Sequence, residues 1–186
     1  EYNRCLHAIR AYILAGDTYQ VNFTYRLQSI TAIDPWRLFV QIAGDGEAPF
    51  AGFVDTGEWA ICSASPELFL RLDGNQIESR PMKGTAARGL WFEDDQMKKE
   101  SLISSEKEQA ENVMIVDMVR NDLGRVAIPG SLQVPSLFDI EMYPTVWQMT
   151  STVRASTHAS LGRILQATFP PASITGAPKR RTMEII

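Results

Sequence analysis

The chain has 186 residues, of which 45% are hydrophobic and 22% are charged, and its formal net charge is -4. This composition is ordinary for a soluble globular protein with one sizeable domain. The small negative charge argues against nucleic acid or an anionic membrane as the main partner, and the apolar stretches are too short to span a bilayer. Cys5 and Cys62 follow no CxxC pattern, which indicates a reducing cytoplasm.

The first third of the chain predicts two helices and a strand. Apolar residues at helical spacing predict a helix over residues 2–14. Alternating side chains predict a strand over residues 19–27. Asp34 as N-cap and Pro35 in the first turn predict a second helix over residues 35–42.

A strand meander follows, with turns at residues 55–57 and 73–75. The predicted strands cover residues 50–54, 59–63, 68–72 and 76–80. The tight turn of the last hairpin predicts that Leu72 faces Gln76 and that Lys83 falls opposite Ser65. Glu67 is then a diagonal neighbour of Lys83 on the same face, roughly 7–8 Å away at the backbone.

The second half of the chain predicts further helices and a strand. Ser105 and Glu108 form a capping box at the start of the strongest predicted helix, and Gly124 ends it. The predicted segments are a helix over 106–123, a strand over 146–154, a helix over 161–168, and a loop over 173–179 leading into a helix near Pro178. Together the elements predict an α+β fold, with mostly antiparallel sheet layers flanked by helices.

Glu67 and Lys83 are the first candidate site. An amine and a carboxylic acid in one pocket can perform nucleophilic and general-acid chemistry. The alternative is a surface salt bridge at a hairpin end. Gly84 allows a ligand to approach the backbone closely, and the Arg80 guanidinium is suited to holding a carboxylate.

Two carboxylates on the strongest predicted helix are the second candidate. Glu108 and Glu111 lie at i and i+3 on one face, and such a pair suits a hard cation such as Mg²⁺. The capping box is an alternative role for Glu108, and a solvated helix face is one for Glu111.

The run from Thr175 to Lys179 is the third candidate. A small-residue loop that enters a helix presents free N–H groups to an anion, and Lys179 adds positive charge. The alternative is a plain turn with Pro178 at the first helical position.

Taken together, these segments resemble the family of chorismate-utilising enzymes, which includes component I of anthranilate synthase and the isochorismate and salicylate synthases. The resemblance covers nearly the whole chain and implies part of the anthranilate synthase component I-like fold. Because the chain lacks an initial Met and ends inside a helical pattern, we expect residues 1–186 to be a chorismate-binding catalytic domain truncated at both ends relative to the family. The matching runs are Gly16-Asp17-Thr18-Tyr19-Gln20-Val21-Asn22, Ser65-Pro66-Glu67, Arg80-Pro81-Met82-Lys83-Gly84-Thr85, the segment 105–126 with Ala110-Glu111-Asn112 and Arg120-Asn121-Asp122, and the segment 174–179.

Two positions distinguish the reactions that this resemblance implies. Isochorismate and salicylate synthases carry a water-activating lysine where this chain has Gln20, which argues against a water-adding reaction. Anthranilate synthases carry alanine where this chain has Lys83, and a lysine there is typical of aminodeoxychorismate synthase component I. The alternatives are anthranilate synthase component I and a catalytically incomplete fragment that keeps only the fold.

The resemblance implies a mechanism in which Lys83 attacks C2 of chorismate and protonated Glu67 donates a proton to the departing C4 hydroxyl. Ammonia, supplied from glutamine by an amidotransferase subunit or domain, then attacks C4 and expels Lys83. Mg²⁺ held by Glu111, with Glu108 in support, offsets the charge of the ring carboxylate. The implied substrate-binding residues are Arg80, Gly84, Thr85, Gln148, Thr175, Gly176, Ala177 and Lys179, with Gln148 standing where family members often have histidine.

Overall fold

The computed structural model describes residues 1–44 and 48–186. Its main sheet is five-stranded and antiparallel, in the order β4-β5-β8-β6, with β7 on the other edge of β8. The strands are β4 (Leu68–Asp73), β5 (Gln76–Arg80), β6 (Met82–Ala87), β7 (Gln133–Met142) and β8 (Val146–Ser156). The α+β prediction is therefore confirmed.

Strands β5 and β6 follow one another along the same edge of β8, interrupted at Pro81. The register of β6 shifts between Met82 and Thr85, so Lys83 and Gly84 occupy a bulge. Gly84 has φ +96°, a left-handed backbone conformation that favours glycine. Because bulges redirect side chains, this irregularity determines where Lys83 points.

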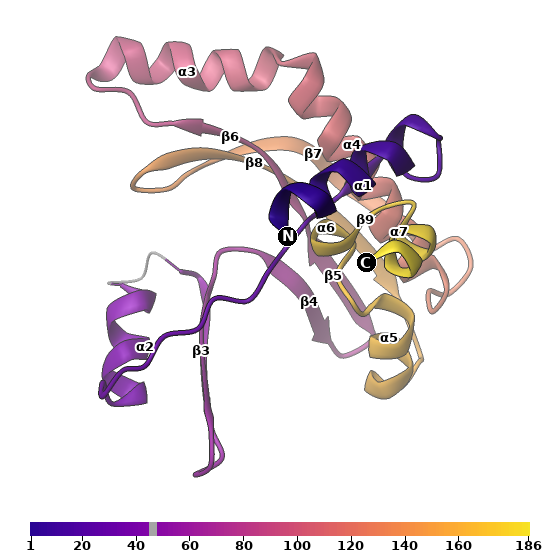
Figure 1. The fold of residues 1–186 in the computed structure, drawn as a ribbon. Helices are drawn as coiled ribbons and strands as arrows, with labels where there is room; N and C mark the ends of the chain where they lie inside the picture. Colours follow the sequence, from indigo (N-terminus) through magenta and orange to yellow (C-terminus); the bar gives the residue numbers. More distant parts are fainter. Residues whose placement is uncertain (45–47) are drawn as a thin grey trace.

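Two helices cover one face of this sheet (Figure 1). Helix α4 (Glu106–Gly124) packs on β6 and β8, and helix α3 (Phe92–Ser104) lies over β6 and the start of β8. The main core forms where α4 meets the sheet and the C-terminal helices. Its fully or nearly buried members are Ile77, Ile115, Val116, Val119, Leu123, Val153, Ala155, Ile164 and Ala172.

The two ends of the chain lie together (Figure 1). Strand β1 (Gln20–Val21) pairs with β9 (Gly176–Ala177), and the buried hydroxyls of Thr18 and Thr182 are 2.8 Å apart. A side chain at Gly176 would lie 2.1 Å from the Gln20 carbonyl oxygen, so this close approach requires glycine. The other terminal elements are α1 (Tyr2–Leu14), α5 (Leu161–Thr168), α6 (Ala172–Thr175) and α7 (Lys179–Ile185).

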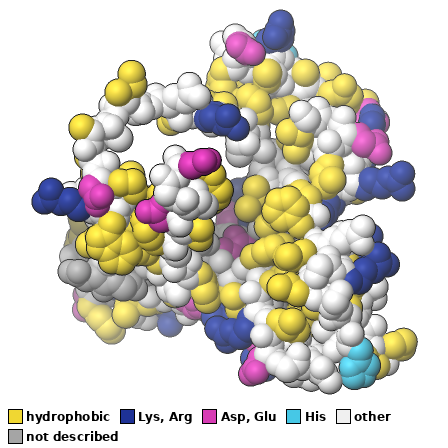
Figure 2. Space-filling view, turned by 90° about the horizontal axis from the view of Figure 1, so that it is seen from below, with side chains coloured by type: hydrophobic (Ala, Val, Ile, Leu, Met, Phe, Trp, Pro, Cys, Tyr) yellow, Lys and Arg dark blue, Asp and Glu magenta, His cyan; other side chains and the backbone are white. Residues whose placement is uncertain are grey.

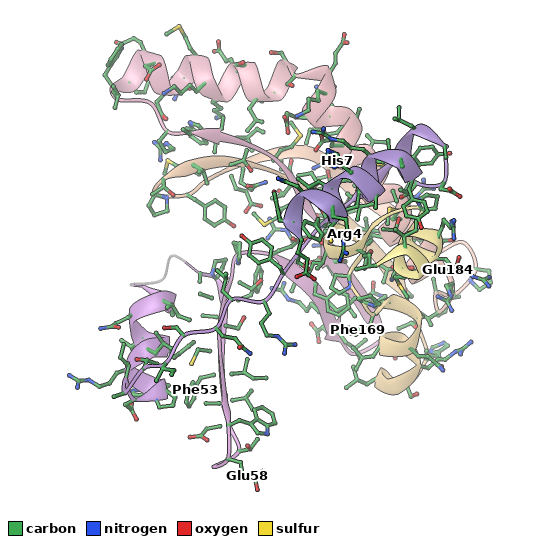
Figure 3. The ribbon with its side chains drawn as sticks, viewed as in Figure 1. Arg4, His7, Phe53, Glu58, Phe169 and Glu184 are labelled. Atoms are coloured by element: carbon green, nitrogen blue, oxygen red, sulfur yellow. The ribbon has the colours of Figure 1, made fainter. Side chains whose placement is uncertain are left out.

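A smaller unit consists of helix α2 (Pro35–Ala43) and the hairpin of β2 (Phe50–Asp55) and β3 (Ala60–Ser65). Aromatic rings pack at its centre: the ring centroids of Trp36 and Phe53 are 5.2 Å apart, and Figure 3 shows Phe53 beside α2. Trp36 and Trp59 are each 54% exposed, and Figure 2 shows that hydrophobic side chains are visible over much of this face of the molecule. No helix in the described ranges combines the length and the apolar character that a membrane crossing needs.

Most predicted helices and strands are confirmed close to their expected bounds, but the strand over residues 19–27 is wrong beyond Gln20–Val21. A strand needs a backbone partner, and β9 supplies one only for those two residues. Residues 24–34 are exposed, including Leu27 and Ile30. The sequence analysis also did not predict α3, β6 or β7.

The predicted hairpin register is wrong near its turn, because Leu72 pairs with Ile77 rather than Gln76. Lys83 is not paired with Ser65 either: Ser65 of β3 pairs with Phe50 of β2, and β6 pairs with β8. Pro81 ends β5, and the chain then continues along β8 instead of extending the hairpin.

Candidate active site

Glu67 lies in the break between β3 and β4, directly before Leu68. The Ser65 hydroxyl accepts a hydrogen bond from the Glu67 backbone N–H at 3.2 Å and so fixes a tight turn there. Burial raises the pKa of the Glu67 carboxyl above its ordinary value of 4.5. The Ser173 side chain, the positive charge of Lys83 and the Met82 backbone amide oppose this shift but do not cancel it. The raised pKa favours the protonated form of the Glu67 carboxyl.

Lys83 projects from the bulge in β6. Its Nζ donates a hydrogen bond to the Ser173 carbonyl oxygen at 3.3 Å. The backbone of the bulge is held from α4, because Asn112 Nδ2 donates to the Lys83 carbonyl oxygen at 3.2 Å. Asn112 is 1% exposed, and its Oδ1 accepts a hydrogen bond from the Ser151 hydroxyl at 2.5 Å.

Glu67 and Lys83 line one pocket of about 320 Å³, which we call the Lys83 pocket. Both side chains lie against Ser173 of α6. The structure thus brings the predicted pair together, by a route other than the predicted hairpin register. The full lining of the Lys83 pocket is Pro66, Glu67, Met82, Lys83, Gly84, Thr85, Tyr143, Val146 and Gln148.

Thr85 and Gln148 form the wall of this pocket where β6 pairs with β8. The Thr85 hydroxyl donates to Gln148 Oε1 at 2.7 Å, and Gln148 Nε2 donates to the Gly84 carbonyl oxygen at 2.8 Å. These two bonds hold the Gln148 amide against the bulge.

Glu108 and Glu111 lie at the start of α4. Ser105 accepts a hydrogen bond from the Glu108 backbone N–H, but the Ser105 N–H donates to Leu102, so only half of the predicted capping box forms. The Glu108 carboxylate is instead close to the bulge, since a methyl group on Gly84 would lie 3.4 Å from Glu108 Oε2.

The two carboxylates converge on one cation, the Lys107 ammonium. Its Nζ is 3.3 Å from Glu108 Oε1 and 3.5 Å from Glu111 Oε1. Within the described residues, His, Cys, Asp and Glu form no group of three or more that is suited to a metal ion. Two carboxylates nevertheless fit Mg²⁺, which takes one or two carboxylates and completes its coordination with water and substrate oxygens.

Thr175, Gly176 and Ala177 are buried in the β1–β9 pairing. The Thr175 carbonyl oxygen accepts the Asn22 N–H at 3.0 Å, and the Thr175 hydroxyl donates back into α6. Thr175 therefore ends α6, and Gly176 and Ala177 form a paired strand rather than the open loop that the sequence suggested.

Arg80 and Lys179 form ion pairs outside the Lys83 pocket. Arg80 pairs with Glu141 of β7. Lys179 Nζ is 2.6 Å from Asp122 Oδ2 and donates to the Thr168 carbonyl oxygen at 2.7 Å. The structure does not bring these two cations to the Lys83 pocket.

The sequence analysis missed the roles of Ser173 and Asn112. Ser173 begins the loop predicted over residues 173–179, outside the Thr175–Lys179 candidate, and nothing in its local sequence indicates that it touches both Glu67 and Lys83. Asn112 follows Glu111 in the predicted helix, and the available signal was its position on the inward face of α4.

The family described as chorismate binding enzyme matches residues 1–186. Aminodeoxychorismate synthase component 1 of Klebsiella aerogenes is 45% identical over 188 residues, covering 100% of this chain and 42% of that protein. The chloroplastic aminodeoxychorismate synthase of Arabidopsis thaliana is 43% identical over 192 residues, covering 100% of this chain and 21% of that protein. Anthranilate synthase component I from Streptococcus pneumoniae TIGR4 has a similar structure, with a TM-score of 0.81, 27% identity, and coverage of 98% of this chain and 40% of that one.

Proposed function

Because the chain belongs to the family of chorismate-binding enzymes, we propose that it is the catalytic core of an aminodeoxychorismate synthase component I. The proposed reaction converts chorismate and ammonia to 4-amino-4-deoxychorismate, the precursor of para-aminobenzoate for folate synthesis. The observation that carries the proposal is that the Lys83 amine and the Glu67 carboxyl, whose pKa is raised by burial, line one pocket. Similarity to curated aminodeoxychorismate synthases over the whole chain supports it.

Each of the two residues has one role in the proposed mechanism. Lys83 Nζ forms a bond to C2 of chorismate, the ring double bonds shift, and the C4 hydroxyl leaves as water with the proton of Glu67. Ammonia then forms a bond to C4, the C2–Nζ bond breaks, and the proton lost by the new amine returns to Glu67. Atoms and protons balance over the cycle.

Other residues of the chain orient the substrate. The Thr85 hydroxyl, the Gln148 amide and the Gly84 backbone form the wall beside Lys83 and are proposed to contact chorismate. Glu108 and Glu111 are proposed to hold Mg²⁺, which when bound offsets the charge of the substrate's ring carboxylate. Thr175, Gly176 and Ala177 remain proposed substrate neighbours, whereas the ion pairs of Arg80 and Lys179 favour structural roles for those two.

An amidotransferase that releases ammonia from glutamine is the proposed partner, and the two free cysteines support a cytoplasmic location. The chain spans less than half the length of the curated relatives named above, so activity is best tested in the full-length protein.

The deciding experiment incubates the protein with chorismate, Mg²⁺ and ammonium, and a coupled lyase converts the product to fluorescent para-aminobenzoate. We expect the wild-type protein to form product and Lys83→Ala to form none. When ammonium is left out, mass spectrometry of the wild-type protein should detect a covalent Lys83–chorismate adduct. Anthranilate formed without the lyase would favour anthranilate synthase component I instead. Folded protein that gives neither product nor adduct would contradict the proposal.

A further inference from the structure

Ser151 is a fully buried residue of β8 that lies between bulges in the two neighbouring strands. The β7 bulge falls within residues 136–139 and lies opposite Ser151. On the other edge of β8, the β6 bulge that carries Lys83 begins after Met82, which pairs with Thr150. Ser151 is therefore placed to connect the two irregularities of the main sheet.

A chain of three hydrogen bonds runs from the β7 bulge through Ser151 to the β6 bulge. The Phe138 backbone N–H donates to the Ser151 hydroxyl at 3.2 Å, and this hydroxyl donates to Asn112 Oδ1 at 2.5 Å. Asn112 Nδ2 then donates to the Lys83 carbonyl oxygen at 3.2 Å. Because a backbone N–H can only donate and a backbone carbonyl can only accept, the direction of every bond in this chain is fixed.

The β6 bulge needs these partners because a bulge interrupts the regular pairing of backbone groups. Asn112 receives the Lys83 carbonyl from α4, and the Ser151 backbone N–H donates to the Pro81 carbonyl oxygen at 3.2 Å. Asn112 and Ser151 are 1% and 0% exposed, so water does not compete for these bonds. The two residues thus hold the backbone on both sides of Lys83 and determine the direction in which its side chain leaves the sheet.

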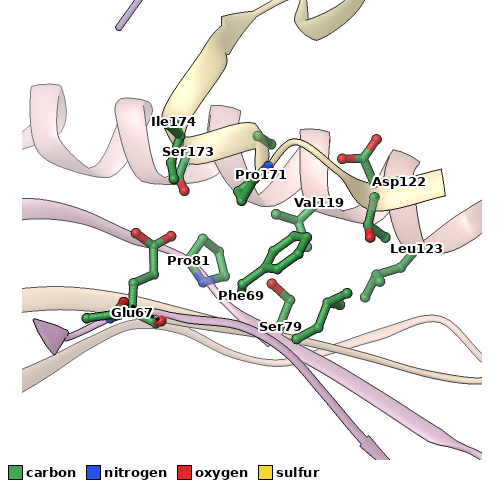
Figure 4. Close-up of a pocket in the computed structure, with 14 residues that line it drawn as sticks. Glu67, Phe69, Ser79, Pro81, Val119, Asp122, Leu123, Pro171, Ser173 and Ile174 are labelled. Atoms are coloured by element: carbon green, nitrogen blue, oxygen red, sulfur yellow. Dashed lines mark hydrogen bonds between the residues drawn. The ribbon is translucent and has the colours of Figure 1, made fainter. Parts of the chain in front are cut away.

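The far end of the Lys83 side chain must be placed closely for the proposed reaction. Its Nζ donates to the Ser173 carbonyl oxygen at 3.3 Å, and Figure 4 shows the side chains of Ser173 and Glu67 pointing toward one another. Reacting atoms need to lie about 3–3.5 Å apart and in line, and a misplacement of about 1 Å can lower a rate by roughly 10²-fold. A small movement of the β6 bulge is therefore enough to slow attack by Lys83.

We propose that Asn112 and Ser151 are positioning residues for the nucleophile, which hold the β6 bulge so that Lys83 Nζ points at the substrate. This inference rests on the proposed aminodeoxychorismate synthase reaction. Neither residue is among those that line the Lys83 pocket, so both act through the backbone of Lys83.

The test removes bonds of this chain one at a time. Ser151→Ala removes the hydroxyl that orients the Asn112 amide, and Asn112→Ala removes the bond to the Lys83 carbonyl directly. Thr152→Val is the matched control, because it removes the hydroxyl of the next residue along β8. That hydroxyl bonds to a serine of β7 at 3.2 Å and takes no part in the chain.

The main measurement is the rate of Lys83–chorismate adduct formation in the full-length protein, without ammonium and at saturating chorismate. We expect this rate to fall by about tenfold in Ser151→Ala and by about 10²-fold in Asn112→Ala. The Kd for chorismate and the Mg²⁺ concentration for half-maximal activity should stay within about twofold of wild type.

The double variant distinguishes positioning from general support of the fold. It should be no slower than Asn112→Ala alone, because the Ser151 hydroxyl reaches Lys83 only through Asn112. Thr152→Val should keep the wild-type rate. Thermal unfolding checks that each variant is folded, and Ser151→Ala carries the test if Asn112→Ala does not fold.

Several results would overturn the positioning role. An unchanged rate in folded Ser151→Ala and Asn112→Ala would remove it while leaving the proposed function intact. Losses that multiply in the double variant, or an equal loss in Thr152→Val, would show that these residues only support the sheet. A changed Mg²⁺ dependence would place the effect at Glu111 instead. A wild-type protein that forms neither adduct nor product would remove the proposed function and the positioning role together.

Discussion

Gly84→Ala is expected to destabilise the native protein by about 2–5 kcal/mol, through two separable costs. The φ of +96° places an alanine in a backbone region that costs an L-residue about 1–2 kcal/mol. The added methyl group would lie 3.1 Å from Met149 Cβ and 3.3 Å from Glu108 Cβ. Such overpacking costs about 1–3 kcal/mol more, because α4 or β8 must move.

Gly57→Ala separates the two costs. Gly57 has φ +83° and no atom within 4 Å of the added methyl group, so only the backbone strain applies there. The smaller unfolded-state entropy of alanine affects both variants alike. We therefore expect Gly84→Ala to be less stable than Gly57→Ala by about 1–3 kcal/mol.

The assay is urea unfolding with linear extrapolation, together with turnover of chorismate and ammonium. Because Lys83 precedes Gly84 in the bulge, a shift of about 1 Å should also lower kcat by roughly 10²-fold, whereas Gly57→Ala should keep full activity. Equal destabilisation by the two substitutions, with normal activity of Gly84→Ala, would refute the argument that close packing at Gly84 aims Lys83.

Three further predictions concern titrating and charged groups. Burial raises the pKa of Glu67, so ionisation of this carboxyl opposes folding. Wild type and Glu67→Gln should be about equally stable near pH 4, and wild type should become the less stable protein as the pH rises through the folded-state pKa. Thermal unfolding of both proteins across this pH range measures the difference. Glu67→Gln should also lose turnover. If wild type instead gains stability relative to Glu67→Gln as the pH rises, the direction of the Glu67 pKa shift is wrong. Asp122→Asn leaves the buried Lys179 ammonium without its partner and should cost about 3–5 kcal/mol in urea unfolding, against about 0–1 kcal/mol for the exposed pair broken by Asp117→Asn. Equal costs would mean that the buried pair is solvated. Glu111→Gln should raise the Mg²⁺ concentration for half-maximal activity by about tenfold, and an unchanged metal dependence would remove Glu111 from the proposed metal site.

Local sequence chemistry determined most of the individual elements. Asp34 accepts the Arg37 N–H at 3.0 Å and begins α2, as its pattern predicts, and Ser105 caps α4 in the same way. Caps, turns and side-chain periodicity involve only residues a few positions apart, so a single sequence contains the information needed to predict them. The candidate pair Glu67 and Lys83 was likewise identified from residue types and resemblance.

Tertiary structure decided how those candidates meet. Lys83 reaches Glu67 because β6 pairs with β8, more than sixty positions along the chain, and because a bulge at Gly84 turns its side chain. The same long-range packing placed Ser173 between the two residues and diverted Arg80 and Lys179 into other ion pairs. The strand predicted over 19–27 ends at Val21, where its partner β9 ends. Register and pairing depend on which distant segments bury one another, and local periodicity carries no information about that choice.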